Sequence, residues 1–339
     1  MKETIVILGA SGTLGTYLVD ELSKMGQYRL VVCGNRNLNE AYYQRLGIET
    51  AKIDIRQKAA FEALPTSNVK AVVQIAGVMP SRMEGYEPSL YLETNILGSF
   101  NVLEYCRVHN VEKYIFTQSH SDVAGFWNTG KAIPPDASRR LNLKGDHAVY
   151  IISKNAAVDL SEHYFQDFGI KNVILRLPTI YSYRSFSEMY VDGRRAIMAY
   201  RFLIDEAKKG SPLEIWGDPT ISKDIVYVKD FTQMVVKAIS SENSRGFYNV
   251  ATGKATSLEE QVRGVAKVFN PTGRSSEIIY RPEKPSQTSY LYDIENAKKD
   301  LGYEPKYNYL QLLEDMKLEM ELGRFEHIDE ARLNYKSKQ

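Results

Sequence analysis

The chain has 339 residues, a length that corresponds to about two domains and buries a large apolar core. Lys and Arg together number 43 and Asp and Glu 42, so the net charge of +1 excludes a broad cationic surface for nucleic acid or an anionic membrane. Hydrophobic residues at 43% and charged residues at 25% exclude a disordered or collagen-like chain.

Apolar runs alternate with amphipathic helical patterns through the first half of the chain. We predict strands at residues 4–8, 28–33, 69–75, 113–117 and 172–175. We predict helices between these strands at residues 15–25, 95–109 and 148–168. Continuous apolar strands separated by helices are typical of a parallel sheet covered on both faces, so the predicted fold class is α/β with a doubly wound parallel (Rossmann) sheet.

The regularity weakens after residue 176. The elements predicted there are a helix at 194–208 after a polar loop at 181–195, strands at 225–228 and 246–250, and helices at 258–269, 296–301 and 310–332. The last of these helices is rich in charged residues. We interpret it as a solvated helix or an oligomer contact.

The chain has only two cysteines, Cys33 and Cys106, which excludes a disulfide framework and a Cys-based zinc site. The apolar run Ile5–Leu8 is too short for a signal peptide, and no run approaches the about 18 apolar residues of a membrane span. No metal-ligand spacing occurs. We therefore expect a cytoplasmic protein that uses no metal and has no membrane or nucleic-acid partner.

The first predicted strand runs directly into Gly9-Ala10-Ser11-Gly12-Thr13-Leu14-Gly15, and a helix follows. In this spacing the first Gly permits a tight turn, the second lets the backbone approach a pyrophosphate, and the third allows close packing of the helix. Free N–H groups at the helix N-terminus then face the phosphates. The alternative is a purely structural turn, but the place of the motif at the first strand-to-helix turn favours a dinucleotide site.

The end of the second strand usually distinguishes NAD from NADP, since an acidic side chain there binds the ribose 2′-hydroxyl and an Arg accommodates a 2′-phosphate. Here the strand ends without an acid, and Arg36 follows it. Arg36 therefore favours NADP over NAD, and the alternative is a surface Arg in a polar loop.

The glycine motif and the pattern of elements predict two domains. Residues 1–176, with returning segments near 221–252, form the NAD(P)-binding domain. Residues 177–220 and 253–339 form a smaller C-terminal substrate-binding α+β domain.

A tyrosine stands four residues before a lysine in Tyr150-Ile151-Ile152-Ser153-Lys154. Positions i and i+4 share a helix face, so the Lys154 ammonium is expected near the Tyr150 phenol. A free phenol has a pKa of about 10, and a neighbouring cation, with an oxidised nicotinamide ring, favours the phenolate and lowers that pKa. With 23 tyrosines in the chain this spacing also arises by chance. Its place on the helix after a central strand favours a catalytic role.

These motifs resemble the extended short-chain dehydrogenase/reductase family, the NAD-dependent epimerases and dehydratases that act on nucleotide sugars. The resemblance runs from residue 4 to about residue 310. Besides the glycine motif, the matching segments are VVQIAG at 72–77, NILG at 95–98, IFTQS at 115–119, YIISK at 150–154, VILR at 173–176, KDIVYVKD at 223–230 and DIENAKKDLGYEP at 293–305.

The resemblance implies specific roles for residues at these positions. Ser119 would hydrogen-bond the reacting sugar oxygen, Tyr150 would shuttle its proton, and Lys154 would bind the nicotinamide ribose. Hydride would move between the sugar carbon and the nicotinamide. Besides the glycine-motif residues Gly9, Ser11, Gly12, Thr13, Leu14 and Gly15, the implied cofactor contacts are Asp54 and Ile55 at the adenine, Ile75, Ala76 and Gly77 at the ribose and phosphates, Asn95, and Leu177 and Pro178 at the carboxamide. The implied substrate contacts are Val78, Ser119, Thr179, Lys223 and Arg281.

Several positions depart from the family pattern. Gln74 stands where the family usually has His, and Thr179 replaces a common Asn. Lys223 replaces a phosphate-binding Arg, so it can neutralise a diphosphate but lacks the bidentate fork of Arg. Ser121 is a rival to Ser119 as the catalytic hydroxyl. Dehydratases carry an Asp-Glu pair after that hydroxyl, and this chain offers only Asp122, which argues against a dehydratase.

Two further groups of side chains near the motifs have open roles. His120 or His147 could donate to a sugar hydroxyl or relay a proton, and the alternative for each is a structural histidine. Tyr181 and Tyr183 are candidates for lining the substrate cleft. The nearby arginines at 184, 194 and 195 could supply further cations or simply be solvated.

The leading hypothesis is an NAD(P)-dependent sugar-nucleotide epimerase. Its rivals are an NADPH-dependent reductase, or a dehydratase, of a keto-sugar nucleotide or another carbonyl compound. A remote alternative is a non-catalytic dinucleotide sensor, which would have no need of Ser119, Tyr150 and Lys154 together. The resemblance also implies a homodimer formed through the helices that begin near Asn95 and contain Tyr150.

Overall fold

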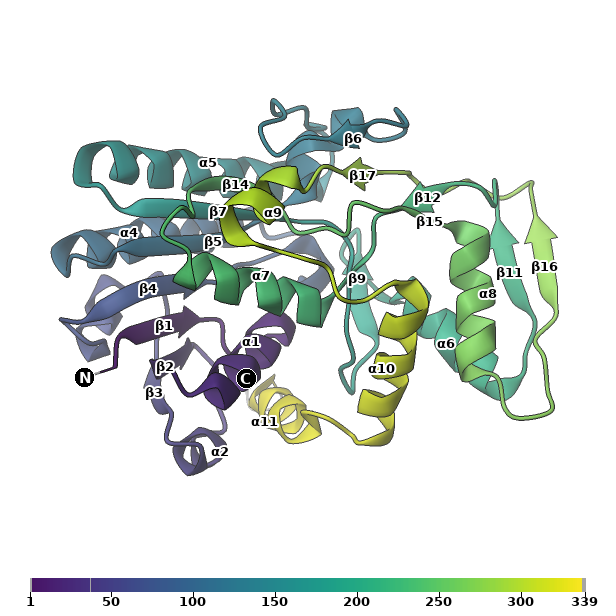
Figure 1. Ribbon diagram of the computed structural model, residues 1–339, viewed down its shortest axis with the longest axis horizontal. Coiled ribbons are helices and arrows are strands. Elements are labelled where there is room, and N and C mark those ends of the chain that lie inside the picture. The colour runs from purple at the N-terminus through teal and green to yellow at the C-terminus, as the bar shows by residue number, and fades with distance from the viewer. Residues whose placement is uncertain (1, 37, 337–339) are drawn as a thin grey trace.

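Seven parallel strands form the central sheet in the computed structural model, which describes residues 2–36 and 38–336 (Figure 1). The strand order is β14-β7-β5-β4-β1-β2-β3, and every neighbouring pair is parallel. The strands are β1 (Thr4–Leu8), β2 (Arg29–Gly34), β3 (Glu49–Lys52), β4 (Val69–Gln74), β5 (Lys113–Ser119), β7 (Lys171–Leu177) and β14 (Gly246–Asn249). The predicted doubly wound sheet is confirmed. The strand order reverses between β1 and β4, where such sheets bind ligands beyond the strand ends.

Alternating side chains of the central strands enter two different apolar cores, because successive residues of a strand point to opposite faces. Ile5 and Ile7 of β1 enter the core beneath α1 (Thr13–Met25), α7 (Val228–Ser240) and α9 (Glu295–Leu301). Val6 and Leu8 enter the core beneath α4 (Gly98–Val108) and α5 (Asp146–Phe168). Both faces of the sheet are therefore covered, which explains why β1 is a continuous apolar run.

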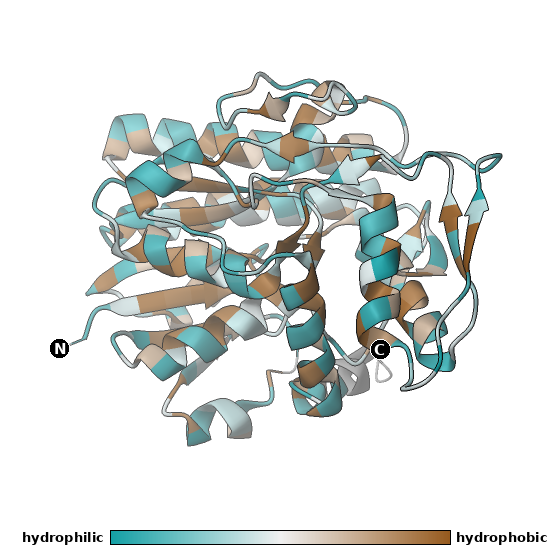
Figure 2. Cartoon of the chain, turned by 45° about the vertical axis from the view of Figure 1, so that its right-hand side comes forward, coloured by the Kyte–Doolittle hydropathy of each residue, from teal (hydrophilic) through white to brown (hydrophobic). Residues whose placement is uncertain are grey.

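A second group of elements packs around a third apolar core, at the right of Figure 1. It contains α6 (Ala199–Lys209), β11 (Leu213–Trp216), α8 (Leu258–Phe269), β16 (Ile278–Arg281) and α10 (Tyr309–Glu321). Hydropathy colouring shows brown strands in the central sheet and teal outer surfaces on many of the surrounding helices (Figure 2). The domain boundaries at 176, 220 and 252 stay a prediction, and residues 337–339 of the predicted second domain lie outside the described residues.

The remaining elements are short connections. Three pairs of two-residue strands link the two parts of the chain: β6 (Ala132–Ile133) with β17 (Leu291–Tyr292), β8 (Ile180–Tyr181) with β13 (Val226–Tyr227), and β12 (Ser222–Lys223) with β15 (Thr256–Ser257). The short helical segments are α2 (Glu40–Arg45), α3 (Pro88–Tyr91), a π-helical turn at Leu92–Leu97 and 3-10 turns at Lys58–Ala63, Pro80–Arg82 and His120–Phe126.

The helix predicted at 194–208 is wrong in its first turn. Residues 194–197 instead form β10 (Arg194–Ile197), which pairs antiparallel with β9 (Glu188–Val191). Asp192 and Gly193 connect the two strands with φ angles of 48° and 71°. A two-residue Asp-Gly turn with both φ angles positive has the twist that a β-hairpin requires, so this dipeptide was the signal for the hairpin.

The interpretation of the C-terminal stretch as a solvated helix is also wrong, whereas the alternative of an oligomer contact stays a prediction. Two helices, α10 and α11 (Glu326–Lys336), pack against the rest of the chain. Phe325 and Ile328 lie in the third apolar core, and the Asp329 side chain is fully buried. Two charged residues of this stretch, Glu319 and Asp329, are buried against other polar groups, so charge alone did not indicate exposure.

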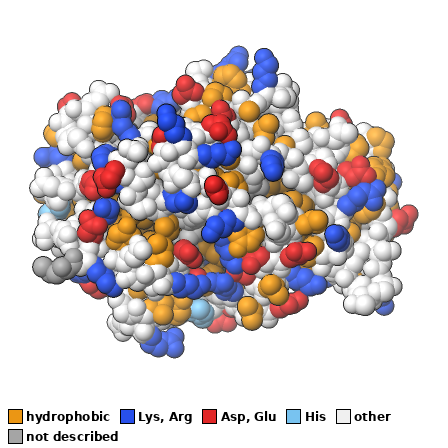
Figure 3. Space-filling view, viewed as in Figure 1, with side chains coloured by type: hydrophobic (Ala, Val, Ile, Leu, Met, Phe, Trp, Pro, Cys, Tyr) orange, Lys and Arg blue, Asp and Glu red, His pale blue; other side chains and the backbone are white. Residues whose placement is uncertain are grey.

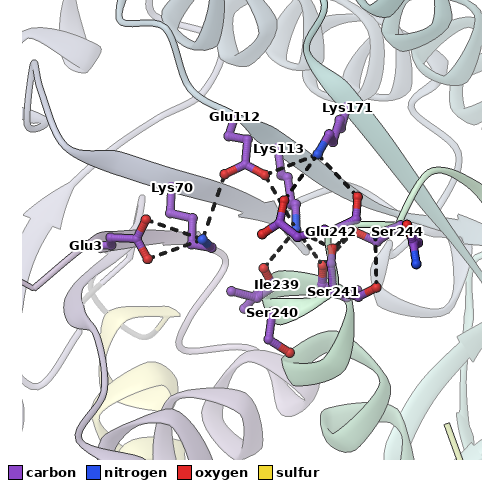
Figure 4. Close-up of polar contacts among 12 residues, drawn as sticks. Glu3, Lys70, Glu112, Lys113, Lys171, Ile239, Ser240, Ser241, Glu242 and Ser244 are labelled. Carbon is purple, nitrogen blue, oxygen red and sulfur yellow. Dashed lines mark hydrogen bonds and ion pairs between the residues drawn. The ribbon is translucent and has the colours of Figure 1, made fainter. Parts of the chain in front are cut away.

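A cluster of charged side chains lies at the amino ends of β4, β5 and β7, opposite the edge where ligands bind (Figure 4). The buried Lys113 donates to the carbonyl oxygens of Ile239 at 3.0 Å and Ser241 at 2.6 Å, where α7 ends. Helix C-termini leave carbonyl groups unpaired, so a lysine there satisfies them and complements the helix dipole. Lys171 pairs with Glu112 at 3.5 Å. This cluster anchors α7 to the sheet.

On the face of the molecule in Figure 3, acidic and basic side chains are interspersed rather than segregated. This distribution agrees with the net charge of +1. Within residues 2–36 and 38–336, no helix has the length and apolar character needed to cross a bilayer.

Candidate active site

The turn between β1 and α1 has the geometry of a phosphate cradle. Gly9 has a φ of 93°, and a Cβ there would lie 2.6 Å from the backbone nitrogen of Ala76. A Cβ on Gly15 would lie 2.3 Å from the Gly9 carbonyl oxygen. Gly12 begins α1 without a capping side chain, and the first helical turn carries no acidic residue. The first N–H groups of α1 are therefore free to bind an anion, which fits a dinucleotide pyrophosphate.

The segment after β4 lies directly beside this turn. The backbone N–H groups of Ile75 and Ala76 both donate to the Leu8 carbonyl oxygen at 2.9 Å. Thus Ile75, Ala76 and Gly77 border the glycine turn at the switch point, as the cofactor assignment requires. Leu177 ends β7 at the same carboxyl edge, and Pro178 follows it.

Asp54 and Ile55 lie beyond the end of β3, on the adenine side of the predicted cleft. The Asp54 carboxylate accepts from Arg56 at 2.7 Å, and this hydrogen bond holds the pKa of Asp54 below its ordinary value. The Ile55 side chain packs closely against Gly98, because a Cβ added to Gly98 would lie only 2.7 Å from Ile55 Cδ1. Gly98 therefore lets α4 approach the loop that carries Asp54.

Arg36 is half-buried, two residues after β2 ends, where a cofactor ribose would lie. Burial lowers the pKa of Arg82, and the positive charge of Arg36 contributes to the same shift. Both guanidinium groups therefore add positive charge to this region. Such a pair of cations favours a bound anion between the loops after β2 and β4.

Asn95 is a buried connector in the π-helical turn that precedes α4. Its side-chain amide accepts from Val78 N at 2.9 Å and donates to Val78 O at 3.0 Å. The same Nδ2 donates to Ser153 Oγ, also at 3.0 Å. Asn95 thus fixes the loop after β4 to the helix that carries Tyr150. The predicted cofactor residue Asn95 and the predicted substrate residue Val78 are in direct contact.

Ser119 and Tyr150 meet at the carboxyl edge of the sheet. Ser119 ends β5, and Tyr150 lies in the second turn of α5 with 8% of its side chain exposed. The Ser119 hydroxyl acts on the Tyr150 phenol and lowers its pKa. Burial acts in the opposite direction and is the larger effect, so the pKa of Tyr150 is raised to about 12. The phenol is therefore protonated at neutral pH.

Lys154 is buried one turn after Tyr150, with its ammonium 3.8 Å from the centre of the Phe116 ring. Burial lowers the pKa of Lys154 to about 7. Burial of the phenol dominates its pKa here, and the residues that shift it are Ser119 and Asp122, so the lowering of the Tyr150 pKa by Lys154 with an oxidised nicotinamide stays a prediction. A Cβ on Gly77 would lie 3.9 Å from Lys154 Nζ, so Lys154 faces the predicted ribose site.

Of the two rival hydroxyls, Ser119 has the contact with Tyr150. The backbone N–H of Ser121 donates to Ser119 Oγ at 3.3 Å, which fixes the Ser119 side chain. Asp122 is fully buried and accepts from Arg176 Nε and Nη2, both at 3.0 Å. Because this carboxylate is held in an ion pair, it is not free to protonate a leaving hydroxyl.

The remaining predicted substrate residues lie on the C-terminal side of the site. Thr179 Oγ1 is hydrogen-bonded to the phenol of Tyr290. Lys223 lies in β12 and donates to Gln287 Oε1 at 2.5 Å, and burial lowers its pKa. Arg281 is half-buried in β16 and pairs with Glu214 at 2.9 Å. Arg281 is therefore already matched with a carboxylate, unlike Lys223, whose partner is neutral.

Sequence reasoning left one group of side chains beside Ser119 without a role. We call it the aromatic group, and it contains His120, Trp127, Tyr290 and Tyr292, whose rings have centroids 4.8 to 6.1 Å apart. In the sequence, only the position of His120 immediately after Ser119 indicated that this group lies beside the site. His147, the other candidate histidine, lies edge-on to Tyr150 at 6.3 Å. Across residues 2–36 and 38–336 no three metal-binding side chains gather.

A glycine turn and a Ser-Tyr-Lys set at one edge of a doubly wound sheet define a dinucleotide-dependent enzyme of the short-chain dehydrogenase/reductase class. The model of the NAD dependent epimerase/dehydratase family matches residues 5–251. The chain belongs to this family and is an enzyme that depends on a nicotinamide dinucleotide.

The chain is similar over nearly its whole length to several sugar-nucleotide enzymes. A putative UDP-glucose 4-epimerase of Methanocaldococcus jannaschii is 26% identical over 89% of this chain and 93% of that protein. The UDP-glucuronate 4-epimerase of Thermodesulfobacterium geofontis is 25% identical over 89% and 91%.

Solved structures share the fold. The UDP-glucose 4-epimerase of Thermotoga maritima, crystallised with UDP-glucose, superposes with a TM-score of 0.74 at 22% identity over 94% of this chain and 99% of that one. The Thermus thermophilus UDP-glucose 4-epimerase in complex with NAD superposes with a TM-score of 0.72 at 22% identity, over 92% and 98%.

Proposed function

We propose that the protein is an epimerase of a nucleotide diphosphate sugar, with Tyr150 as the acid/base. The observation that carries this proposal is the meeting of Ser119, at the end of β5, with the buried Tyr150 of α5, at the sheet edge where the glycine turn also lies. Relatives whose names include UDP-glucose 4-epimerase and UDP-glucuronate 4-epimerase support the substrate class.

The residues around the switch point fit a nicotinamide dinucleotide. The pyrophosphate would bind the turn of Gly9, Gly12 and Gly15, and Lys154 would hydrogen-bond the nicotinamide ribose. When bound, the nicotinamide supplies a two-electron acceptor and donor of hydride. Solved structures of two related epimerases contain NAD, which supports this class of cofactor. Arg36 and its neighbour Arg82 support NADP, and the two dinucleotides are separated by a prediction below.

Ser119 and Tyr150 would hold the oxygen of the reacting sugar carbon between their hydroxyl groups. With an oxidised nicotinamide bound, its positive charge would favour the Tyr150 phenolate, which would then take the proton of the sugar hydroxyl as the carbon is oxidised to a ketone. Tyr150 would return this proton to the ketone oxygen when hydride is restored to the opposite face of the carbon, which would give the epimer. Burial holds the Tyr150 ring, and the backbone N–H of Ser121 holds the Ser119 hydroxyl, so both side chains keep this geometry without substrate.

The diphosphate of the substrate would bind on the C-terminal side of the site. Lys223 supplies a cation whose protein partner, Gln287, is neutral and easily displaced. Arg281 would have to exchange its pairing with Glu214 for a phosphate. Val78 and Thr179 would line the sugar pocket from β4 and β7 respectively.

A reductase of a keto-sugar nucleotide is the second candidate, since Arg36 favours the reducing dinucleotide NADPH. A dehydratase is disfavoured because Asp122 is held by Arg176. A non-catalytic sensor is disfavoured because it has no need of a buried Tyr150 beside Ser119 and Lys154.

We also propose a homodimer through α4 and α5. Leu97 and Phe100 at the start of α4, and Ile152 of α5, have 47%, 39% and 45% of their surface exposed. Apolar side chains of this size on neighbouring helices favour burial against a second copy.

The two cysteines, Cys33 and Cys106, are buried free thiols, which supports our proposal of a cytoplasmic location.

The proposal is tested by incubating the purified full-length protein with uridine-, guanosine- and thymidine-diphosphate sugars, after mass spectrometry has identified any co-purified dinucleotide. Formation of an epimer with no net change in nicotinamide absorbance supports the epimerase. Net NADPH consumption with a keto-sugar nucleotide would identify the reductase instead. Absence of both reactions from a protein that binds the dinucleotide contradicts the proposed function.

A further inference from the structure

The aromatic group holds the His120 imidazole in one orientation beside Ser119. His120 Nδ1 lies 2.8 Å from the Tyr292 hydroxyl, and Trp127 Nε1 lies 3.3 Å from the same hydroxyl. The Trp127 and Tyr290 rings flank the imidazole at centroid distances of 4.8 and 5.0 Å. An imidazole with this many neighbours has little rotational freedom, so both ring nitrogens have fixed directions.

The hydrogen-bonding rules of these groups assign the His120 tautomer. The Trp127 indole N–H can only donate, so it uses one lone pair of the Tyr292 oxygen. Tyr292 is 1% exposed, and its own O–H must therefore be used inside the protein. Among the described residues His120 Nδ1 is the acceptor within reach. A neutral imidazole that accepts at Nδ1 carries its proton at Nε2.

The environment of His120 keeps the imidazole neutral. Burial lowers its pKa to about 3, and the positive charges of Lys223 and Arg176 and the nearby His147 act in the same direction. The imidazole is thus close to Lys223, our candidate for binding the substrate diphosphate, and to His147, which contacts Tyr150. Within the described residues Nε2 has no hydrogen-bond partner, and the side chain is half-buried rather than sealed.

We propose that His120 Nε2–H donates a hydrogen bond to an oxygen of the substrate sugar. Tyr292 and Trp127 are then positioning residues, which fix the tautomer and the direction of this donor. The inference rests on the proposed function for the identity of the ligand, but the tautomer is a property of the free protein. It adds a specificity contact beside Ser119.

The tautomer is tested by ¹⁵N–¹H NMR of the imidazole groups in the uniformly labelled full-length protein. We expect a protonated Nε2 and an unprotonated Nδ1 for His120. Tyr292→Phe removes the hydroxyl donor and should shift the signals toward a mixture of tautomers. Tyr290→Phe is the matched control, because its hydroxyl bonds Thr179 and only its ring contacts His120. An Nδ1-protonated His120, or a spectrum unaffected by Tyr292→Phe, would overturn the assignment.

The substrate contact is tested by steady-state kinetics and by calorimetric binding of UDP-glucose, or of the nucleotide sugar that the enzyme turns over. His120→Asn should raise KM roughly 3–10-fold, the range of a single hydrogen bond, and change kcat by less than about 3-fold. His120→Gln reaches the Nε2 position with its amide and should restore part of the affinity. An active enzyme whose KM is unchanged in His120→Asn overturns this inference alone. A wild-type protein that neither binds nor epimerises any of these nucleotide sugars overturns the proposed function and this contact with it.

Discussion

The Arg184 guanidinium and the Asp329 carboxylate form a buried ion pair that joins the segment after β8 to α11, with side chains 2% and 0% exposed. Asp329 also accepts from the backbone N–H of Ser185 at 3.0 Å and from its hydroxyl at 2.8 Å. Arg184 donates to Thr16 Oγ1 at 3.4 Å, and Thr16 lies in the first turns of α1 after the glycine turn. The C-terminal helix is therefore connected through Arg184 to the helix that would bind the cofactor phosphates.

Asp329→Asn should lower the free energy of unfolding by about 3–5 kcal/mol, because it leaves the Arg184 charge buried without its counter-ion. Chemical denaturation measures this loss. The control is Glu49→Gln, which breaks the ion pair of Glu49 with Arg29, where the side chains are 53% and 45% exposed. That loss should stay below about 1 kcal/mol. Similar losses in the two variants would contradict the view that Asp329 is a buried structural anion.

Tyr150→Phe should reduce turnover roughly 10²–10⁴-fold, since it removes the group that exchanges a proton with the sugar oxygen. Affinity for the dinucleotide should stay within a few fold, because the phenyl ring keeps the packing against Tyr91. Tyr164→Phe is the matched control on the same helix, where the hydroxyl donates to Glu104 at 2.6 Å. Wild-type turnover in Tyr150→Phe would contradict the mechanism.

Six of the seven strands of the central sheet could be predicted because their signals are local, whereas the edge strand β3 (Glu49–Lys52) has no apolar run and was not predicted. The apolar run Thr4–Leu8 and the glycine spacing that follows it lie within 12 residues, and their conformation depends on nearest neighbours. The hairpin at Asp192 and Gly193 had an equally local signal, but it was hidden in a polar loop whose partner segment was not recognised as a strand. The burial of Asp329 had no local signal, because Arg184 is 145 residues away in sequence.

The candidate site divides in the same way. Ser119 and Tyr150 could be placed together because their motifs end one central strand and begin the adjacent helix. The protonation state of Tyr150 could not be predicted from the sequence, since its pKa depends on burial that only tertiary packing creates. Similarly, Asp122 looks like a free acid in the sequence and is held by Arg176 from a neighbouring strand.

Arg36→Ala should weaken NADP binding roughly tenfold or more and leave NAD binding within about 2-fold, because only NADP carries a 2′-phosphate for the guanidinium. Fluorescence titration with each reduced dinucleotide measures both affinities. Arg45→Ala is the control, since Arg45 is an exposed arginine on the nearby α2. Equal weakening of both dinucleotides by Arg36→Ala would remove the argument for a 2′-phosphate site.

Lys154→Met should change the pH dependence of stability. The pKa of Lys154 is lowered to about 7 in the folded protein, whereas an unfolded lysine has a pKa of about 10.4. Between these values the unfolded chain binds more protons than the folded one, so the contribution of Lys154 to folding rises with pH. The slope approaches about 1.4 kcal/mol per pH unit inside the window and vanishes outside it.

Unfolding of wild type and Lys154→Met in denaturant, at pH values from 6 to 10, isolates this contribution because all other titrating groups are common to both. At about pH 6 the variant should be the more stable, since a thioether is buried in place of a charge. Its advantage should shrink steadily as the pH rises above about 7, where the wild-type ammonium loses its proton in the folded state. Curves that stay parallel over this range would show that Lys154 keeps an ordinary pKa, and that the Phe116 face stabilises its charge against burial.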